Sequence, residues 1–139
     1  MTVSTEAETR YLLGAELAQA GHYDRAVQEM RAAVQMQPDL HTASLQLGLL
    51  LLTMNEPSDA ITAWQPLDRL DERAALRLFK GGLEALIHED FERCIRLLTQ
   101  GIAANTTNPA LNRDMNLVIA RARDTELRAV RTDFSLYDQ

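Results

Sequence analysis

Residues 11–38, YLLGAELAQAGHYDRAVQEMRAAVQMQP, contain two runs of apolar residues at helical spacing. Spacings of i, i+3, i+4 and i+7 give a helix one apolar face. Gly21 and His22 divide the runs, and Pro38 closes the second because proline cannot continue a helix without losing a hydrogen bond. The stretch therefore predicts two amphipathic helices joined by a short turn. The apolar residues are Leu13, Leu17 and Ala20 in the first run, and Ala26, Val27, Met30, Ala33 and Val34 in the second.

The pattern of this helix pair recurs along the chain at a constant spacing. The number of residues from Gly14 to Gly48 equals the number from Gly48 to Gly82. A fixed period, here of about 34 residues, is the signature of a repeat architecture. The small residues predict a close approach of paired helices, where a larger side chain costs about 1–3 kcal/mol. The same step relates Leu13 to Leu47, Leu17 to Leu51 and Ala85, Ala26 to Ala60 and Cys94, and Met30 to Trp64 and Leu98.

Further turns are expected at residues 55–57 and 88–90, where each later helix pair should reverse. Asn108 and Pro109 suit the start of another helix, as N-cap and first helical residue. Because no second helix of a fourth repeat follows, residues 109–130 are expected to form a capping helix, with 132–139 as a flexible tail. The expected apolar stripe of the capping helix consists of Leu111, Met115, Val118, Ile119 and Ala122.

Two positions depart from the repeat pattern. Pro66 falls inside the second helix of the second unit and predicts a kink near Thr62. Gly81 precedes Gly82 in mid-helix, where we interpret it as a tolerated substitution rather than a contact with another chain.

The spacing of Leu13-Gly14, Tyr23, Ala26, Ala33 and Pro38 resembles the tetratricopeptide repeat (TPR) family. The resemblance implies repeats at about 7–40, 41–74 and 75–108. It implies an all-α, right-handed α-solenoid of three helix-turn-helix repeats with a capping helix, forming a single domain over residues 1–131. The second repeat lacks the closing proline and the third has Cys94 in place of an alanine.

The bulk composition narrows the classes of partner. The net charge of −6 argues against nucleic acid, since phosphate neutralisation needs a basic surface. The longest apolar run, residues 47–52, is too short to cross a bilayer, and the N-terminal residues lack the apolar stretch of a signal peptide. We therefore expect a cytoplasmic protein that binds neither nucleic acid nor membrane.

No catalytic or metal-binding motif is recognisable, so we predict neither enzymatic activity nor a cofactor. His22, His41 and His88 fall in different repeats, without the close spacing of metal ligands. Phosphate-binding glycine loops and nucleophile elbows are missing from the sequence. Cys94 occupies a small-residue position and is interpreted as an inert core thiol.

The family resemblance also implies a concave peptide-binding groove, lined by the first helix of each repeat. Carried onto this chain, the lining positions are apolar, and an exposed apolar patch usually marks an interaction site. We therefore predict an adapter or chaperone-like module that binds an apolar segment of a protein partner. The implied residues are Tyr11, Ala15, Ala18, Leu45, Leu49, Leu52, Phe79, Leu83 and Leu86, with Lys80 as the one suitable charge.

Related uses of the family fold sharpen this prediction. The chain is loosely similar to the three-repeat chaperones of type III secretion translocators, which are also small and acidic. TPR domains that clamp a C-terminal carboxylate need lysine and asparagine where Tyr11 and Ala15 stand, so that function is not expected.

The groove has alternative occupants. The tail, with Phe134, Leu136 and Tyr137, could fold back over it, or a tight superhelix could close it. A structural, self-associating subunit that forms a homo-oligomer through the groove or the capping helix is the alternative function.

Overall fold

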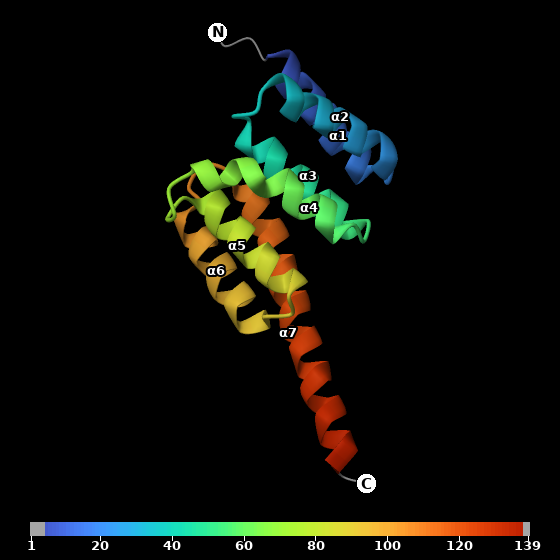
Figure 1. The fold of residues 1–139 in the computed structure, drawn as a ribbon, viewed down its shortest axis with the longest axis vertical. Coiled ribbons are helices and arrows are strands. Elements are labelled where there is room, and N and C mark those ends of the chain that lie inside the picture. Colours follow the sequence, from blue (N-terminus) through green and yellow to red (C-terminus); the bar gives the residue numbers. More distant parts are fainter. Residues whose placement is uncertain (1–4, 138–139) are drawn as a thin grey trace. The chain divides into compact units, whose positions relative to one another are not determined.

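The computed structural model describes residues 5–137, and side chains as far as Arg128. Over this range the chain forms seven α-helices and one 3₁₀ helix, without strands (Figure 1). The prediction of an all-helical fold of helix-turn-helix pairs is confirmed. The elements are α1 (Glu6–Gln19), α2 (Tyr23–Met36), α3 (His41–Thr53), α4 (Pro57–Trp64), η1 (Gln65–Arg69), α5 (Ala75–Ile87), α6 (Phe91–Ala104) and α7 (Pro109–Tyr137).

The chain divides into two compact units, Met1–Leu70 and Asp71–Gln139, each of which is described by itself. The single domain expected over residues 1–131 therefore stays a prediction. In unit 1, α1 packs against α2, α2 against α3, and α3 against α4, while η1 contacts α3 and α4. In unit 2, α6 packs against both α5 and α7.

The turn inside each helix pair contains one residue in the left-handed backbone region. These residues are Gly21, Asn55 and Glu89, with φ angles of 85°, 63° and 60°, and they occupy the same position in successive repeats. A left-handed residue after the last helical turn satisfies carbonyl groups that the helix leaves unpaired. The predicted breaks are confirmed at all three positions.

The repeated glycines lie where the paired helices come closest, as predicted. A Cβ atom at Gly14 would stand 2.8 Å from Met30 Cγ, and one at Gly82 would stand 2.6 Å from Leu98 Cδ2. At Gly48 a Cβ atom would overlap the indole ring of Trp64. Glycine is required at these three positions because the facing side chains leave no space for a Cβ atom.

Pro66 ends α4 instead of kinking it. The α-helix stops at Trp64 and continues as the 3₁₀ helix η1. Because Pro66 has no N–H group, it cannot donate to the Thr62 carbonyl, and a 3₁₀ turn accommodates the missing bond.

The last helix is longer than expected. α7 continues to Tyr137, whereas we predicted an end near residue 130 and a loose tail from 132. Neither glycine nor proline follows Pro109, so the sequence contains no residue that would stop the helix. Residues 138–139 lie outside the described range.

The apolar faces were predicted better for later helices than for α1. On α7, Leu111, Met115, Ile119 and Ala122 are buried as expected. On α1, only Leu17 of the expected stripe is buried, while Leu13 and Ala20 are exposed. The reason is positional, because the equivalent Leu47 lies on α3, which packs against both α2 and α4, whereas α1 has its main helix contact with α2.

Candidate peptide-binding surface

Five of the predicted groove residues form a half-buried apolar set on two helices of unit 1. Tyr11, Ala15 and Ala18 lie on α1, and Leu49 and Leu52 lie on α3. We call these five residues the α1–α3 face. They occupy equivalent positions in the period, since Leu49 and Leu52 lie one full repeat after Ala15 and Ala18.

The small residues beside these positions fix the orientation of the α1–α3 face. Gly14 points toward Met30 of α2, and Gly48 points toward Trp64 of α4. Ala15 and Leu49 each follow one residue later, so they are turned about 100° around the helix axis from these contacts. This rotation leaves both side chains partly in solvent.

Polar contacts between the paired helices hold this orientation. Trp64 Nε1 donates a hydrogen bond to the Leu45 carbonyl oxygen at 3.1 Å, within the buried interior. On the other pair, Arg10 Nη1 lies 3.4 Å from Glu29 Oε2 and connects α1 with α2. The first contact satisfies a buried donor, and the second is partly exposed and contributes about 1 kcal/mol at most.

Three predicted groove residues belong to the core instead. Leu45, Phe79 and Leu83 each have 0% exposed surface, so their side chains cannot contact a ligand in this structure. Phe79 is turned toward α6, because a Cβ atom at Gly101 would lie 2.5 Å from its ring. The glycine leaves space that the aromatic ring fills, at the position where the first repeat has Ala33.

The remaining predicted residues lie on α5 in unit 2. Leu86 is half-buried. The Lys80 side chain is 12% exposed, and its Nζ atom lies 3.2 Å from Glu84 Oε1 on the same helix. Its charge is therefore balanced within α5, which makes Lys80 a poor attractor for an acidic ligand.

The α1–α3 face has a chemistry suited to apolar contacts. It carries four aliphatic side chains and one phenol, without a carboxylate or an ammonium group among them. Full burial of a leucine or phenylalanine side chain contributes about 1.5–3 kcal/mol. Leu49 and Leu52 are already partly buried, so covering their remaining exposed surface would contribute at most about 2 kcal/mol together to binding a partner, before association costs.

The single thiol of the chain, Cys94, lies on α6. Cys94 is completely buried, and its pKa is raised to about 11, first by desolvation and then by the Asp90 carboxylate. The thiol is therefore protonated at neutral pH and a weak nucleophile. Among residues 5–128, no three side chains of His, Cys, Asp or Glu gather as metal ligands.

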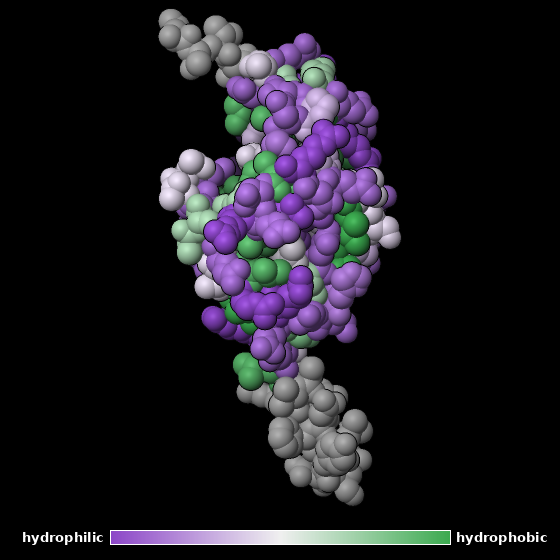
Figure 2. Space-filling model, turned by 60° about the vertical axis from the view of Figure 1, so that its left-hand side comes forward, coloured by the Kyte–Doolittle hydropathy of each residue, from purple (hydrophilic) through white to green (hydrophobic). Residues whose placement is uncertain are grey.

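Several exposed apolar side chains were missed by the sequence analysis. Leu12 is 55% exposed, and on α7 Leu117 and Leu127 are 65% and 58% exposed. Figure 2 shows hydrophilic side chains over most of the drawn face, with small hydrophobic patches between them. Leu117 follows Leu83 by one full repeat, but Leu83 is fully buried, so the period does not indicate the exposure of Leu117.

A comparison with known proteins supports the fold. MamA, a solved structure, is similar with a TM-score of 0.53 and 21% sequence identity, over 81% of this chain and 64% of MamA. This chain thus spans less than two thirds of the length of MamA. The likeness shows a helical-repeat fold. No protein-family model and no curated protein matches the sequence significantly.

Within the described part of the chain, every helix is either too short or too polar to cross a bilayer.

Proposed function

We propose that this chain is a non-catalytic protein–protein interaction module of the tetratricopeptide-repeat type. The observation that carries the proposal is the α1–α3 face, which exposes aliphatic groups on two helices in equivalent register. Its partner is a protein segment rich in apolar side chains, as an adapter or chaperone-like protein would bind. A reducing, cytoplasmic location fits the single buried thiol.

The TPR assignment rests on features that recur at one spacing. The glycine contacts at Gly14, Gly48 and Gly82 and the left-handed turn residues all follow the same period. Helix pairs of this length with a small residue at each crossing are the building unit of TPR solenoids.

The proposal is tested with a peptide library of graded hydropathy, in which matched members have the same length and net charge. Binding is measured by fluorescence polarisation for the wild-type chain and for Leu49→Glu. We expect selected apolar peptides to lose about tenfold or more in affinity, equivalent to about 1.4 kcal/mol, because the new carboxylate must be desolvated.

Gln28→Glu provides the matched control, since Gln28 is exposed on α2, outside the α1–α3 face, and the substitution adds the same charge. It should bind as the wild type does. If Leu49→Glu remains folded by circular dichroism and binds every selected peptide with unchanged affinity, the α1–α3 face is not the binding site.

A further inference from the structure

The outer side of α7 carries a stripe of exposed residues that no other part of the described chain covers. Between Ala110 and Leu127 these residues follow one another at alternating steps of three and four. This spacing is the a/d heptad pattern by which two helices pack against each other. The stripe consists of Ala110, Arg113, Leu117, Ala120, Asp124 and Leu127, all of them exposed.

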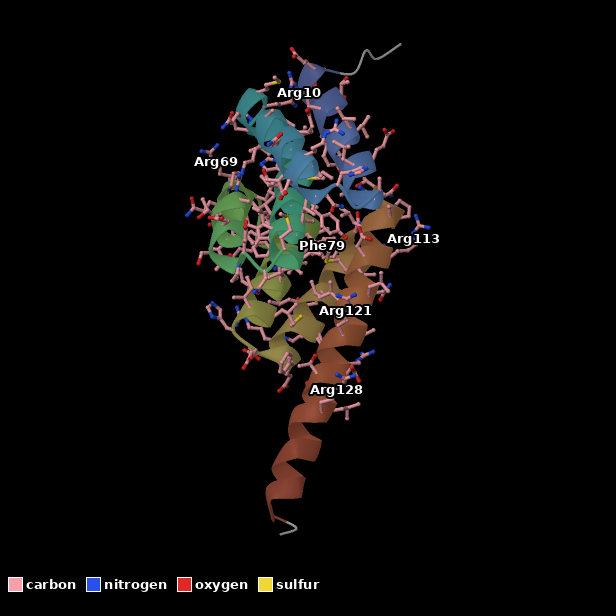
Figure 3. All side chains as sticks on the ribbon, turned by 90° about the vertical axis from the view of Figure 1, so that its right-hand side faces the viewer. Arg10, Arg69, Phe79, Arg113, Arg121 and Arg128 are labelled. Carbon is pink, nitrogen blue, oxygen red and sulfur yellow. The ribbon has the colours of Figure 1, made fainter. Side chains whose placement is uncertain are left out.

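The stripe faces away from the body of unit 2. The buried side of α7, which includes Met115 and Ile119, packs against α6. With about 3.6 residues per turn, the stripe lies on the opposite side of the helix. Figure 3 shows Arg113, Arg121 and Arg128 along the same helix. A second helix can therefore approach α7 without displacing α6.

The C-terminal part of α7 extends beyond the residues that pack against the rest of unit 2. Ala122 is the last buried residue among those described, and the residues from 123 to 128 are all exposed. The helical backbone nevertheless continues to Tyr137. An isolated helix of about 12–15 residues is marginal in water, so a packing partner would stabilise this segment.

We propose that the stripe is a self-association surface, on which α7 of a second copy packs in the antiparallel direction. In the register that places Leu117 opposite Ala120 of the second copy, Arg113 lies opposite Asp124 and Ala110 opposite Leu127. Each contact occurs twice by two-fold symmetry. Large apolar residues then meet small ones, and every charge on the stripe meets its opposite.

The flanking charges favour the same register. Asp114 and Arg121 lie on the same flank of the stripe, so in the antiparallel pair Asp114 of one copy lies near Arg121 of the second copy, which adds another pair of opposite charges. A parallel arrangement would instead place Arg113 against Arg113 and Asp124 against Asp124. The stripe is therefore self-complementary in one direction only, and this charge complementarity selects a second copy as the occupant over an unrelated apolar segment.

The test measures the oligomeric state of the full chain by sedimentation velocity between about 1 µM and about 1 mM. The wild type should form a dimer within this range. Leu117→Asp should remain monomeric. Arg113→Asp and Asp124→Arg should each weaken the dimer about tenfold or more, because each places like charges opposite one another at two symmetric sites.

The double variant Arg113→Asp/Asp124→Arg is decisive, because it restores opposite charges in the antiparallel register alone. It should dimerise as the wild type does. Asp124 also pairs with Arg128 on its own helix, at 3.2 Å. A loss caused through that pair would not be recovered by changing Arg113, which lies several helical turns earlier.

Glu126→Arg is the matched control, since it reverses one exposed charge on α7 outside the stripe. It should leave the dimer unchanged. A wild type that stays monomeric over the whole range would overturn the proposal, as would a double variant that fails to recover. Because α7 is not part of the α1–α3 face, either proposal can fail without the other.

Discussion

The α3–α4 and α5–α6 pairs occupy equivalent places in the period, yet they fill the space between their helices differently. In the first pair, Trp64 of the second helix lies over Gly48 of the first helix. In the other pair the large ring is on the first helix, where Phe79 lies over Gly101 of the second. The two aromatic rings therefore cross the interface in opposite directions.

This difference shows what the period determines. It sets which positions face each other, because residues 48 and 82 both contact the partner helix. It does not set which of the facing residues is large, since any combination that fills the volume is accepted. Each pair consequently needs its own small residue at the point where the large ring crosses.

The largest effect is expected for Gly48→Ala, which places a methyl group inside the space of the Trp64 indole. We expect unit 1 to lose about 3 kcal/mol of unfolding free energy, because a buried indole ring cannot move aside. Trp64 is the single tryptophan of the chain, so its fluorescence during urea unfolding reports on this unit.

Gly81→Ala is the corresponding control in unit 2. A Cβ atom there would meet only Leu97 Cδ1, at 3.2 Å, and alanine favours the helix by up to about 1 kcal/mol. Its stability should therefore lie within about 1 kcal/mol of the wild type. Equal losses in Gly48→Ala and Gly81→Ala would contradict a specific requirement at Gly48.

The next largest loss of stability is expected in the α5–α6 pair, where the large ring, Phe79, is on the first helix and the glycine, Gly101, is on the second. Gly101→Ala should destabilise the α5–α6 pair by about 1–3 kcal/mol, since the methyl group collides with the Phe79 ring. Phe79→Leu should reduce this loss in the double variant, because leucine leaves room. A coupling energy of about 0.5 kcal/mol or more in the double-mutant cycle checks the contact, and additive losses would refute it.

The turns give a smaller effect of opposite sign. Glu89 has a left-handed φ of 60°, a conformation that glycine adopts without strain. Glu89→Gly should therefore raise the unfolding free energy by about 1 kcal/mol. Asn55→Gly should gain less, because asparagine tolerates this region. A loss of stability in Glu89→Gly, measured by thermal unfolding, would show that the side chain has another role.

A further effect, expected only at high pH, is a pH dependence from Cys94. Burial raises its pKa from 9.0 to about 11, so the folded protein binds the thiol proton more tightly than the unfolded chain. This contribution to stability is fully present below pH 9.0 and is lost as the pH rises toward about 11. Between these values, the wild type should lose more stability than Cys94→Ala, which has the residue found at the equivalent Ala26 and Ala60. Parallel pH profiles would contradict the assigned cause.

The sequence predicted much of the fold because glycines, turn residues and apolar stripes act over short distances. Gly14, Gly48 and Gly82 indicated the helix contacts, and Leu111 and Met115 indicated the buried side of α7. These features follow from helix geometry alone.

The surface was harder to predict, because exposure depends on what covers each helix. Leu45 and Leu83 were assigned to the same groove as Leu49 but are fully buried, and Leu13 is exposed because α1 packs mainly against α2, whereas α3 packs against two helices. The burial of Phe79 depends on Gly101, which lies on the next helix along the chain, α6. Volume complementarity between distant residues cannot be read from a period.

The location of peptide binding tests the proposed function most directly. A selected apolar peptide with a photoreactive leucine analogue is irradiated with the wild-type chain, and the cross-linked residues are identified by mass spectrometry. We expect cross-links at Ala15, Ala18, Leu49 and Leu52 of the α1–α3 face. Cross-links confined to unit 2, or equal labelling by a polar peptide of the same length, would contradict the proposal.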